Sequence, residues 1–255
     1  MKALLKFLFF FYTTIIIAQN NVEQELLKKY SSYELIKNQK SKYGSWTYKF
    51  ELDNGKIITQ ENYERNTLVY KSKISYDSIN NIKYEIKLYD RNDGYKIDTV
   101  TIEQKIYNNK KELIQLLHKD ESFTRYSNHD LNGFPQLEEY KNHLIYDKRE
   151  FKYDSKNNII EEKIYSKYFD EINNKETDST QIETITYEYN LNNDIISLNR
   201  QFKFPVKFPI IYGGGRSHYE NEKFRYVYNN DDLWTKKYWI INERELLIEK
   251  RKFYR

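Results

Sequence analysis

Histidine and acidic side chains come closest together in one stretch of the chain. This stretch contains His129-Asp130, Glu138-Glu139 and His143. Imidazole and carboxylate groups bind zinc, or act as acids and bases when they lie within hydrogen-bond reach of a substrate. Their spacing here matches no metal signature, so we expect exposed turn and strand residues. The sequence therefore predicts no metal, no cofactor and no catalytic residue, unless folding brings His129, Glu139 and His143 together.

Two neighbouring carboxylates, Glu161 and Glu162, suggest acid–base chemistry at first sight. The paired carboxylates of glycosidases lie about 5–9 Å apart across the substrate. Adjacent residues of a strand point to opposite faces of the sheet. We therefore expect these two residues to belong to an exposed charged face.

A glycine-rich segment, Tyr212-Gly213-Gly214-Gly215-Arg216, could form a nest of backbone amides beside a cation and so bind an anion. No helix-opening phosphate motif follows it. A plain loop is the expected structure.

Aromatic residues are the strongest functional lead, because the chain contains 26 Tyr and 14 Phe. On an exposed face, Tyr226, Trp234, Tyr238 and Trp239 could stack on sugar rings or on apolar groups of a partner. The alternative is that they fill the inner face of a sheet or form cross-strand pairs. These four residues are the candidate ligand-binding residues.

The elements that would position these residues follow a repeat, seen most clearly in FKYDSKNNII at residues 151–160. Further copies are ISYDSINNIKYEIKLY at 74–89, YEYNLNNDII at 187–196, FRYVYNNDDLW at 224–234 and YKFELDNGKII at 48–58, with weaker copies at 106–113 and 128–134 and a final hairpin at 239–247. Asn-Asn and Asn-Gly tolerate the positive φ of tight hairpin turns. The flanking residues alternate between apolar and charged, as in strands with one buried face.

These patterns predict an all-β fold, an antiparallel meander of β-hairpin repeats over residues 45–255. The meander would form an extended twisted sheet or an open barrel or sandwich. Unequal spacing argues against a strict solenoid, and polar or Pro/Gly-containing inserts interrupt the repeats at 170–181 and 205–222. Residues 19–44 are expected to be a helical or linker segment, with a helix over 22–40.

The motifs YDSKNNII and YDSINNIKY resemble those of the tyrosine-aspartate (YD, Rhs-type) repeat proteins of bacteria. The first unit, with Gly44-Ser45-Trp46-Thr47-Tyr48 and Asn54-Gly55-Lys56-Ile57, is similar to a variant MORN repeat. The YD consensus usually has Gly where this chain has Asn81, Asn158 or Asn193. Both resemblances imply a chain of β-hairpins. The YD resemblance also implies an exported scaffold, and it transfers no catalytic residue.

The N-terminus has the features of a secretory signal peptide. Lys2 and Lys6 precede an apolar run that ends at Ala18. The run is shorter than the roughly 20 residues that span a bilayer, although an uncleaved anchor is the alternative. The absence of cysteine excludes disulfides and a lipid on an N-terminal cysteine. We therefore expect export to the periplasm, the cell surface or the medium.

The distribution of charged residues limits the classes of partner that the protein is expected to bind. The 42 Lys and Arg are interspersed with 38 Asp and Glu, which does not favour nucleic acid as a partner. The leading hypothesis is a non-catalytic exported scaffold that binds a surface polysaccharide or an envelope protein and is not an integral membrane protein after signal cleavage. Two alternatives are an outer-membrane β-barrel, which charges on both faces of 248–252 argue against, and an extracellular polymer hydrolase, for which no nucleophile is assigned.

Overall fold

The computed structural model describes residues 23–38, 45–64, 66–76, 82–90, 94–117, 122–141, 145–170, 175–176, 181–211 and 217–255. The predicted signal peptide (1–18), the glycine-rich segment at 212–216, His143 and most of the insert at 170–181 lie outside these residues. Among the described residues, no helix is long and apolar enough to cross a membrane.

Strands dominate the part of the chain that the structure describes. The strands are β1 (Ser32–Asn38), β2 (Ser45–Asp53), β3 (Lys56–Glu64), β4 (Thr67–Tyr76), β5 (Ile82–Asp90), β6 (Gly94–Tyr107), β7 (Leu113–Leu117), β8 (Phe123–His129), β9 (Pro135–Lys141), β10 (Ile145–Tyr153), β11 (Ile159–Asp170), β12 (Lys175–Glu176), β13 (Gln181–Tyr189), β14 (Ile195–Phe202), β15 (Ile210–Ile211), β16 (Ser217–His218), β17 (Asn221–Tyr228), β18 (Trp234–Ile241) and β19 (Arg244–Tyr254).

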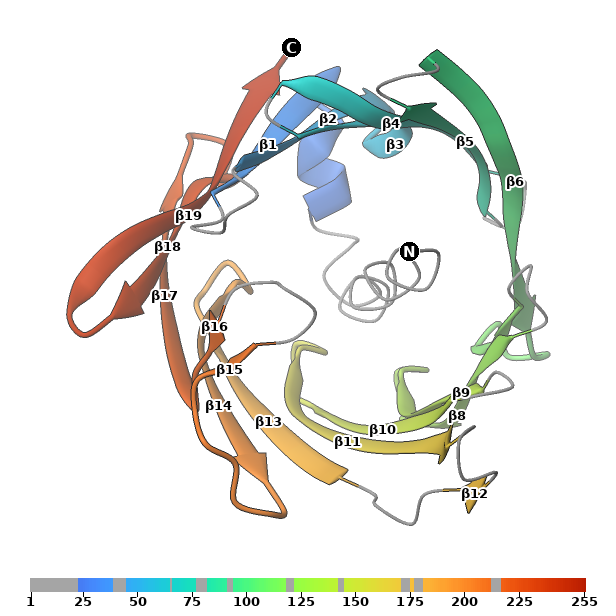
Figure 1. The fold of residues 1–255 in the computed structure, drawn as a ribbon, viewed down its shortest axis with the longest axis vertical. Helices are drawn as coiled ribbons and strands as arrows, with labels where there is room; N and C mark the ends of the chain where they lie inside the picture. Colours follow the sequence, from blue (N-terminus) through green and yellow to red (C-terminus); the bar gives the residue numbers. More distant parts are fainter. Residues whose placement is uncertain are drawn as a thin grey trace.

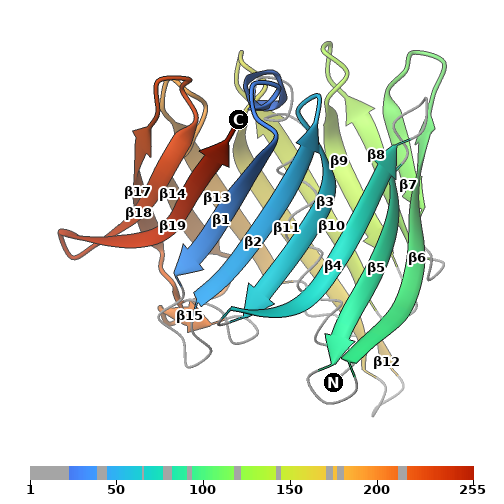
Figure 2. The ribbon, with the colours of Figure 1, turned by 90° about the horizontal axis from the view of Figure 1, so that it is seen from above.

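Consecutive strands pair antiparallel in one large curved sheet, seen as a ring in Figure 1 and from the side in Figure 2. β1 pairs with both β2 and β19, and β9 pairs with both β8 and β10. The short β12 pairs with β11, and β15 and β16 form a separate two-stranded sheet. The prediction of an all-β antiparallel meander is confirmed, and the meander forms a single curved sheet rather than a sandwich.

The N-terminal segment differs from its prediction. Among its described residues, helix occurs only at 23–27, and the expected helix over 22–40 is wrong for residues 32–38, which form β1. Tyr33 and Leu35 point to the same face and pair with Phe50 and Tyr48 of β2. Alternation of this kind is typical of a strand. Because β1 lies between β2 and β19, its backbone N–H and C=O groups have hydrogen-bond partners on both sides. The sheet therefore begins at β1, before residue 45.

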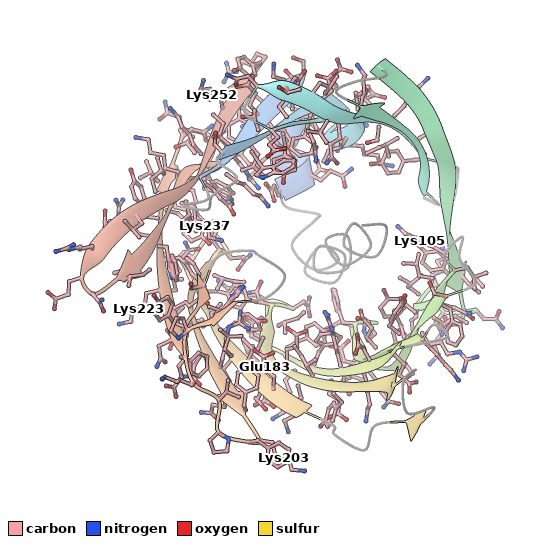
Figure 3. The ribbon with its side chains drawn as sticks, viewed as in Figure 1. Lys105, Glu183, Lys203, Lys223, Lys237 and Lys252 are labelled. Carbon is pink, nitrogen blue, oxygen red and sulfur yellow. The ribbon has the colours of Figure 1, made fainter. Side chains whose placement is uncertain are left out.

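The curvature of the sheet creates an inner and an outer face. Figure 3 shows Lys105, Glu183 and Lys237 directed inward and Lys203, Lys223 and Lys252 directed outward. Directly paired residues of neighbouring strands share a face, so the register extends this assignment around the sheet. Two apolar clusters are buried on the inner side, one around Tyr33 and Phe50 and the other around Ile185 and Trp239.

Five turns of the repeats share one hydrogen-bond pattern. Each opens on an Asn or Asp whose side-chain Oδ1 accepts from the backbone N–H groups two and four residues later; these residues are Asn108, Asp130, Asp154, Asn190 and Asn229. The fourth residue of each turn has a positive φ; these residues are Lys111, Gly133, Asn157, Asn193 and Asp232. The side chain thus replaces a backbone acceptor, as in Asx-turns, and explains why Asn and Asp recur at this position.

Tyrosine hydroxyls connect successive turns. Tyr153 Oη donates to the Pro135 carbonyl at 2.7 Å, and Tyr189 Oη donates to the Ile159 carbonyl at 2.7 Å. Each acceptor is the first residue of the strand that follows the preceding turn. In these repeats, the tyrosine directly before the Asp or Asn that opens the turn therefore forms a hydrogen bond to the preceding repeat.

Candidate ligand-binding face

Three of the four candidate aromatic residues lie on the inner face. Trp234 and Trp239 are buried, with 9% and 8% of their surfaces exposed, and Tyr226 is half-buried. The rings of Tyr226 and Trp234 meet edge to face, with centroids 6.0 Å apart. Tyr238 lies on the outer face, where the Arg225 guanidinium sits 4.3 Å from its ring centre. The two tryptophans therefore pack within the inner layer rather than forming an exposed patch, and only Tyr238 of the four faces outward.

Cations lie against these inner rings. The Arg251 guanidinium is 3.7 Å from the Trp234 ring centre, and Lys237 Nζ is 4.7 Å from the Phe224 ring centre. Such cation–π contacts hold a positive charge where few water molecules solvate it. Burial lowers the pKa of Lys37, which shares this part of the inner face, although Glu249 opposes the change. The inner side of β18, β19 and β1 is thus rich in both rings and cations.

The opposite part of the inner face is acidic. We call it the acidic wall, formed on strands β9 to β17 by Glu138, Asp147, Glu162, Glu183 and Glu222 together with Arg149 and Arg200. Sequence reasoning missed this wall, because its seven residues come from six strands and no strand contributes more than two of them.

The first group of the wall is built around Arg149. Its Nη1 lies 3.4 Å from Glu162 Oε1, and its Nε lies 3.9 Å from Glu138 Oε1. Tyr187 Oη donates to Glu162 Oε2 at 2.8 Å. Glu138 Oε2, by contrast, is buried and accepts no hydrogen bond within the described residues. Burial raises the pKa of Glu138 to about 7; Arg149 opposes this change, while Glu162 and Asp147 add to it.

The second group is built around Arg200. Its Nη1 donates to Glu183 Oε1 at 2.7 Å, and its Nε lies 3.7 Å from Glu222 Oε1. Glu222 has no exposed surface, and His218 Nδ1 lies 3.5 Å from its Oε1. Buried carboxylates require paired charges or hydrogen bonds. This group therefore resembles a structural ion-pair network that also lines the inner face.

The histidine and acidic residues around His129 were expected to be exposed, and this expectation is wrong for Glu138, which is buried with 5% of its surface exposed. His129 Nε2 lies 2.9 Å from the Leu113 carbonyl and so occupies the position that tyrosine takes in other repeats. Glu138 and Glu139 point to opposite faces, and the described residues contain no group of three side chains suited to a metal. His143 lies outside the described residues.

Glu161 and Glu162 also point to opposite faces, as predicted. Glu161 pairs with Lys152 at 2.9 Å on the outer face. The expectation of an exposed position is wrong for Glu162, which is buried with 7% of its surface exposed. A signal was present in the sequence, because Glu162 shares its strand parity with the apolar Ile164.

Comparisons with known proteins concern the fold. No protein-family model matches the chain, and no curated protein matches it. A porin-like protein from Bacteroides uniformis is similar over 88% of this chain and 97% of its own, with 11% identity and a TM-score of 0.49. The TcdB2-TccC3 structure without its hypervariable C-terminal region is similar over 80% of this chain, with 8% identity and a TM-score of 0.28. The matched part is 15% of that longer chain.

Proposed function

We propose that this protein is a non-catalytic, exported binding protein of the bacterial periplasm or cell surface, and that its ligand or partner contacts the inner face of the sheet. The observation that carries this proposal is the difference between the two faces. Partly exposed ion pairs mark the outer face, whereas buried aromatic rings and buried charges line the inner face. Export rests on the sequence features of residues 1–18.

The outer face supports a water-facing surface. Lys71 on β4 pairs with Glu61 on the adjacent β3 at 2.7 Å, and Arg225 on β17 pairs with Glu245 on β19 at 2.5 Å, across β18. A lysine or arginine at the middle of a lipid-facing strand costs about 2–4 kcal/mol. Such pairs are therefore out of place in a hydrocarbon layer, which favours this proposal over the outer-membrane alternative.

The inner face supports binding. It offers tyrosine, phenylalanine and tryptophan rings from several strands together with charged groups of both signs. Rigid aromatic rings supply contact area at a low entropic cost, and charged groups supply selectivity. No nucleophile and base converge among the described residues, so the hydrolase alternative gains no support from this face.

The outer-membrane alternative retains one favourable observation, the arrangement of sixteen main strands that each pair on both sides. Solubility separates the two possibilities. We expect residues 19–255 to remain monodisperse in buffer without detergent, as measured by size-exclusion chromatography with light scattering. Aggregation that only detergent reverses would favour the membrane alternative.

Binding itself is tested with a glycan array and with purified envelope proteins. Trp234 and Trp239 fluorescence reports on the inner face, and a ligand there should change the emission. Tyr226→Ala on the inner face should weaken binding at least tenfold, while Tyr238→Ala on the outer face should leave it within twofold. The reverse order of effects would place binding on the outer face and contradict the proposal.

A further inference from the structure

We propose that the acidic wall receives a cationic group of the ligand, an ammonium or a guanidinium, with Glu138 as its charge partner. This inference rests on the proposed binding function of the inner face and names the chemistry of what binds there. Three observations carry it: the sharing of Arg149 by two carboxylates, the oxygen of Glu138 that accepts no hydrogen bond within the described residues, and the tyrosines next to Glu138 on the same face.

The charge balance comes first. Within the described residues, the wall brings together five carboxylates and two guanidiniums, those of Arg149 and Arg200, and Asp147 and Glu222 make further interactions. His218, beside Glu222, adds a positive charge only when it is protonated. An excess of buried negative charge is unfavourable unless protons or cations offset it. The part of the wall where Glu138 and Glu162 share Arg149 is therefore complementary to a positively charged group.

Glu138 is one of two buried carboxylates in the wall with an oxygen that accepts no hydrogen bond within the described residues, the other being Glu222. Arg149 lies closer to Glu162, at 3.4 Å, than to Glu138, at 3.9 Å. Glu162 also accepts a hydrogen bond from Tyr187, whereas Glu138 Oε2 accepts none within the described residues. With 5% of its surface exposed, Glu138 has little solvation from water in place of a partner. An N–H donor carrying a positive charge would satisfy this oxygen.

Aromatic residues complete the site. Tyr126 is the direct cross-strand partner of Glu138, and Tyr140 follows on the same face of β9; their exposed fractions are 5% and 7%. Rings beside a carboxylate favour organic cations, because the ring faces attract positive charge. The same molecule already places Arg251 on Trp234 in this way. A metal ion fits less well, since the described residues provide no cluster of three metal-binding side chains.

Proton release follows from the surroundings of Glu138. The titratable and charged groups that face it are Tyr126 on β8, Tyr140 on β9, Asp147, Arg149 and Tyr153 on β10, Glu162 on β11 and Tyr187 on β13. Because burial raises the pKa of Glu138 to about 7, a cation that binds near neutral pH must displace a bound proton. Affinity should therefore fall between pH 8 and pH 6.

Isothermal titration calorimetry with a hexalysine peptide tests the inference, with hexaglutamate as the control peptide and low salt in both. We expect hexalysine to bind the wild-type protein, to bind at least tenfold more weakly at pH 6 than at pH 8, and to release a proton near pH 7, seen as a dependence of the heat on the buffer. Glu138→Gln should weaken binding at least tenfold and abolish the proton release. Glu161→Gln, on the outer face, should bind within twofold of wild type.

Equal binding of hexalysine by wild type and Glu138→Gln, or no binding at pH 8, would overturn the inference. Circular dichroism and urea unfolding verify that each variant is folded. If Glu138→Gln fails to fold, Glu138→Asp moves the charge with less disturbance and should still weaken binding severalfold. A neutral glycan that binds in a Tyr226-dependent manner, together with no hexalysine binding, would reject the cationic ligand while leaving the proposed function intact.

Discussion

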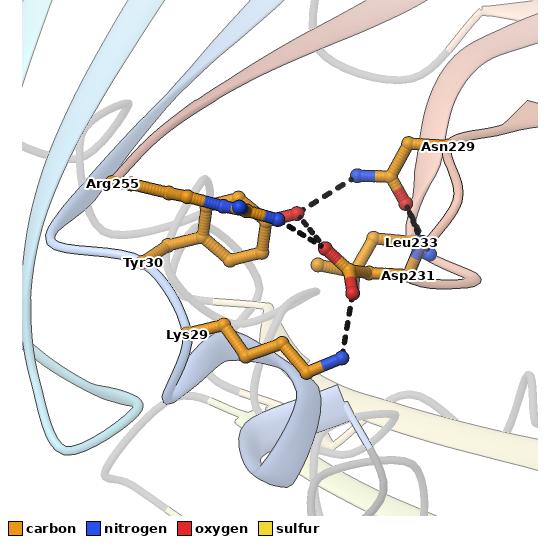
Figure 4. A network of polar contacts seen from close by, with 6 residues as sticks. All are labelled: Lys29, Tyr30, Asn229, Asp231, Leu233 and Arg255. Atoms are coloured by element: carbon orange, nitrogen blue, oxygen red, sulfur yellow. Dashed lines mark hydrogen bonds and ion pairs between the residues drawn. The ribbon is translucent and has the colours of Figure 1, made fainter.

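Asn229 Nδ2 donates a hydrogen bond to Tyr30 Oη at 3.2 Å and so connects the last repeat turn to the start of the described chain. Tyr30 Oη in turn donates to Asp231 Oδ2 at 2.5 Å, and Lys29 and Arg255 converge on the same carboxylate (Figure 4). One repeat earlier, Asn190 Nδ2 donates to Tyr228 Oη at 2.6 Å. Tyr30 therefore supplies to the last turn the tyrosine that a following repeat would supply.

Removing this hydroxyl should loosen the junction of the two chain ends. Tyr30→Phe leaves the ring in place but removes the hydrogen bonds to Asn229 and Asp231, so we expect the free energy of unfolding to fall by about 1–2 kcal/mol in urea titrations. Tyr48→Phe is the matched control, since the Tyr48 ring packs on the same cluster and its hydroxyl makes no hydrogen bond within the described residues. Equal losses in both variants would show that Tyr30 acts only through its ring.

The fourth turn position offers a second test, because Lys111 and Gly133 occupy it with φ angles of 65° and 81°. A lysine in this region carries a steric cost that glycine avoids. Lys111→Gly should raise the free energy of unfolding by about 1 kcal/mol, and Gly133→Ala should lower it by a similar amount.

A Cβ atom at Gly133 would lie 3.6 Å from Glu112 Cγ, which is ordinary contact. The effect of Gly133→Ala therefore reports on the backbone conformation alone. A stabilised Gly133→Ala variant would contradict the shared turn geometry.

The repeats could be read from the sequence because their turns are local. Asp154 and Asn157 lie within one five-residue turn. The side-chain acceptor and the positive φ of this turn favour particular residue types, such as Asp and Asn, which are visible in the sequence. The acidic wall could not be predicted in the same way, because Glu138, Arg149 and Glu162 come from three strands and only their register brings them together. The β1 strand was missed for a similar reason, since its partners β2 and β19 determine its structure.

Glu138 should make stability depend on pH. Its pKa rises from 4.5 to about 7 on folding, so between these values the folded protein keeps a proton that the unfolded chain loses. The free energy of unfolding should therefore fall as the pH rises from about 4.5 to 7, by at most roughly 3 kcal/mol. Glu138→Gln should lack this part of the pH dependence in urea titrations between pH 5 and 8, while Glu161→Gln should retain it. Parallel curves for wild type and Glu138→Gln would show that Glu138 is ionised throughout.

Trp239 and Tyr238 are adjacent in the chain but lie on opposite faces, so they test the division between the faces directly. Trp239 packs with Phe224, Ile185 and Leu198 and is 8% exposed, and its replacement by alanine should cost about 3–5 kcal/mol because a cavity remains. Tyr238→Ala removes a ring that contacts Arg225 at the surface and should cost less than about 1 kcal/mol. Chemical unfolding of the two variants under the same conditions measures both values. Similar losses would mean that the outer face is packed as tightly as the inner one, which would remove the main support for placing the ligand inside.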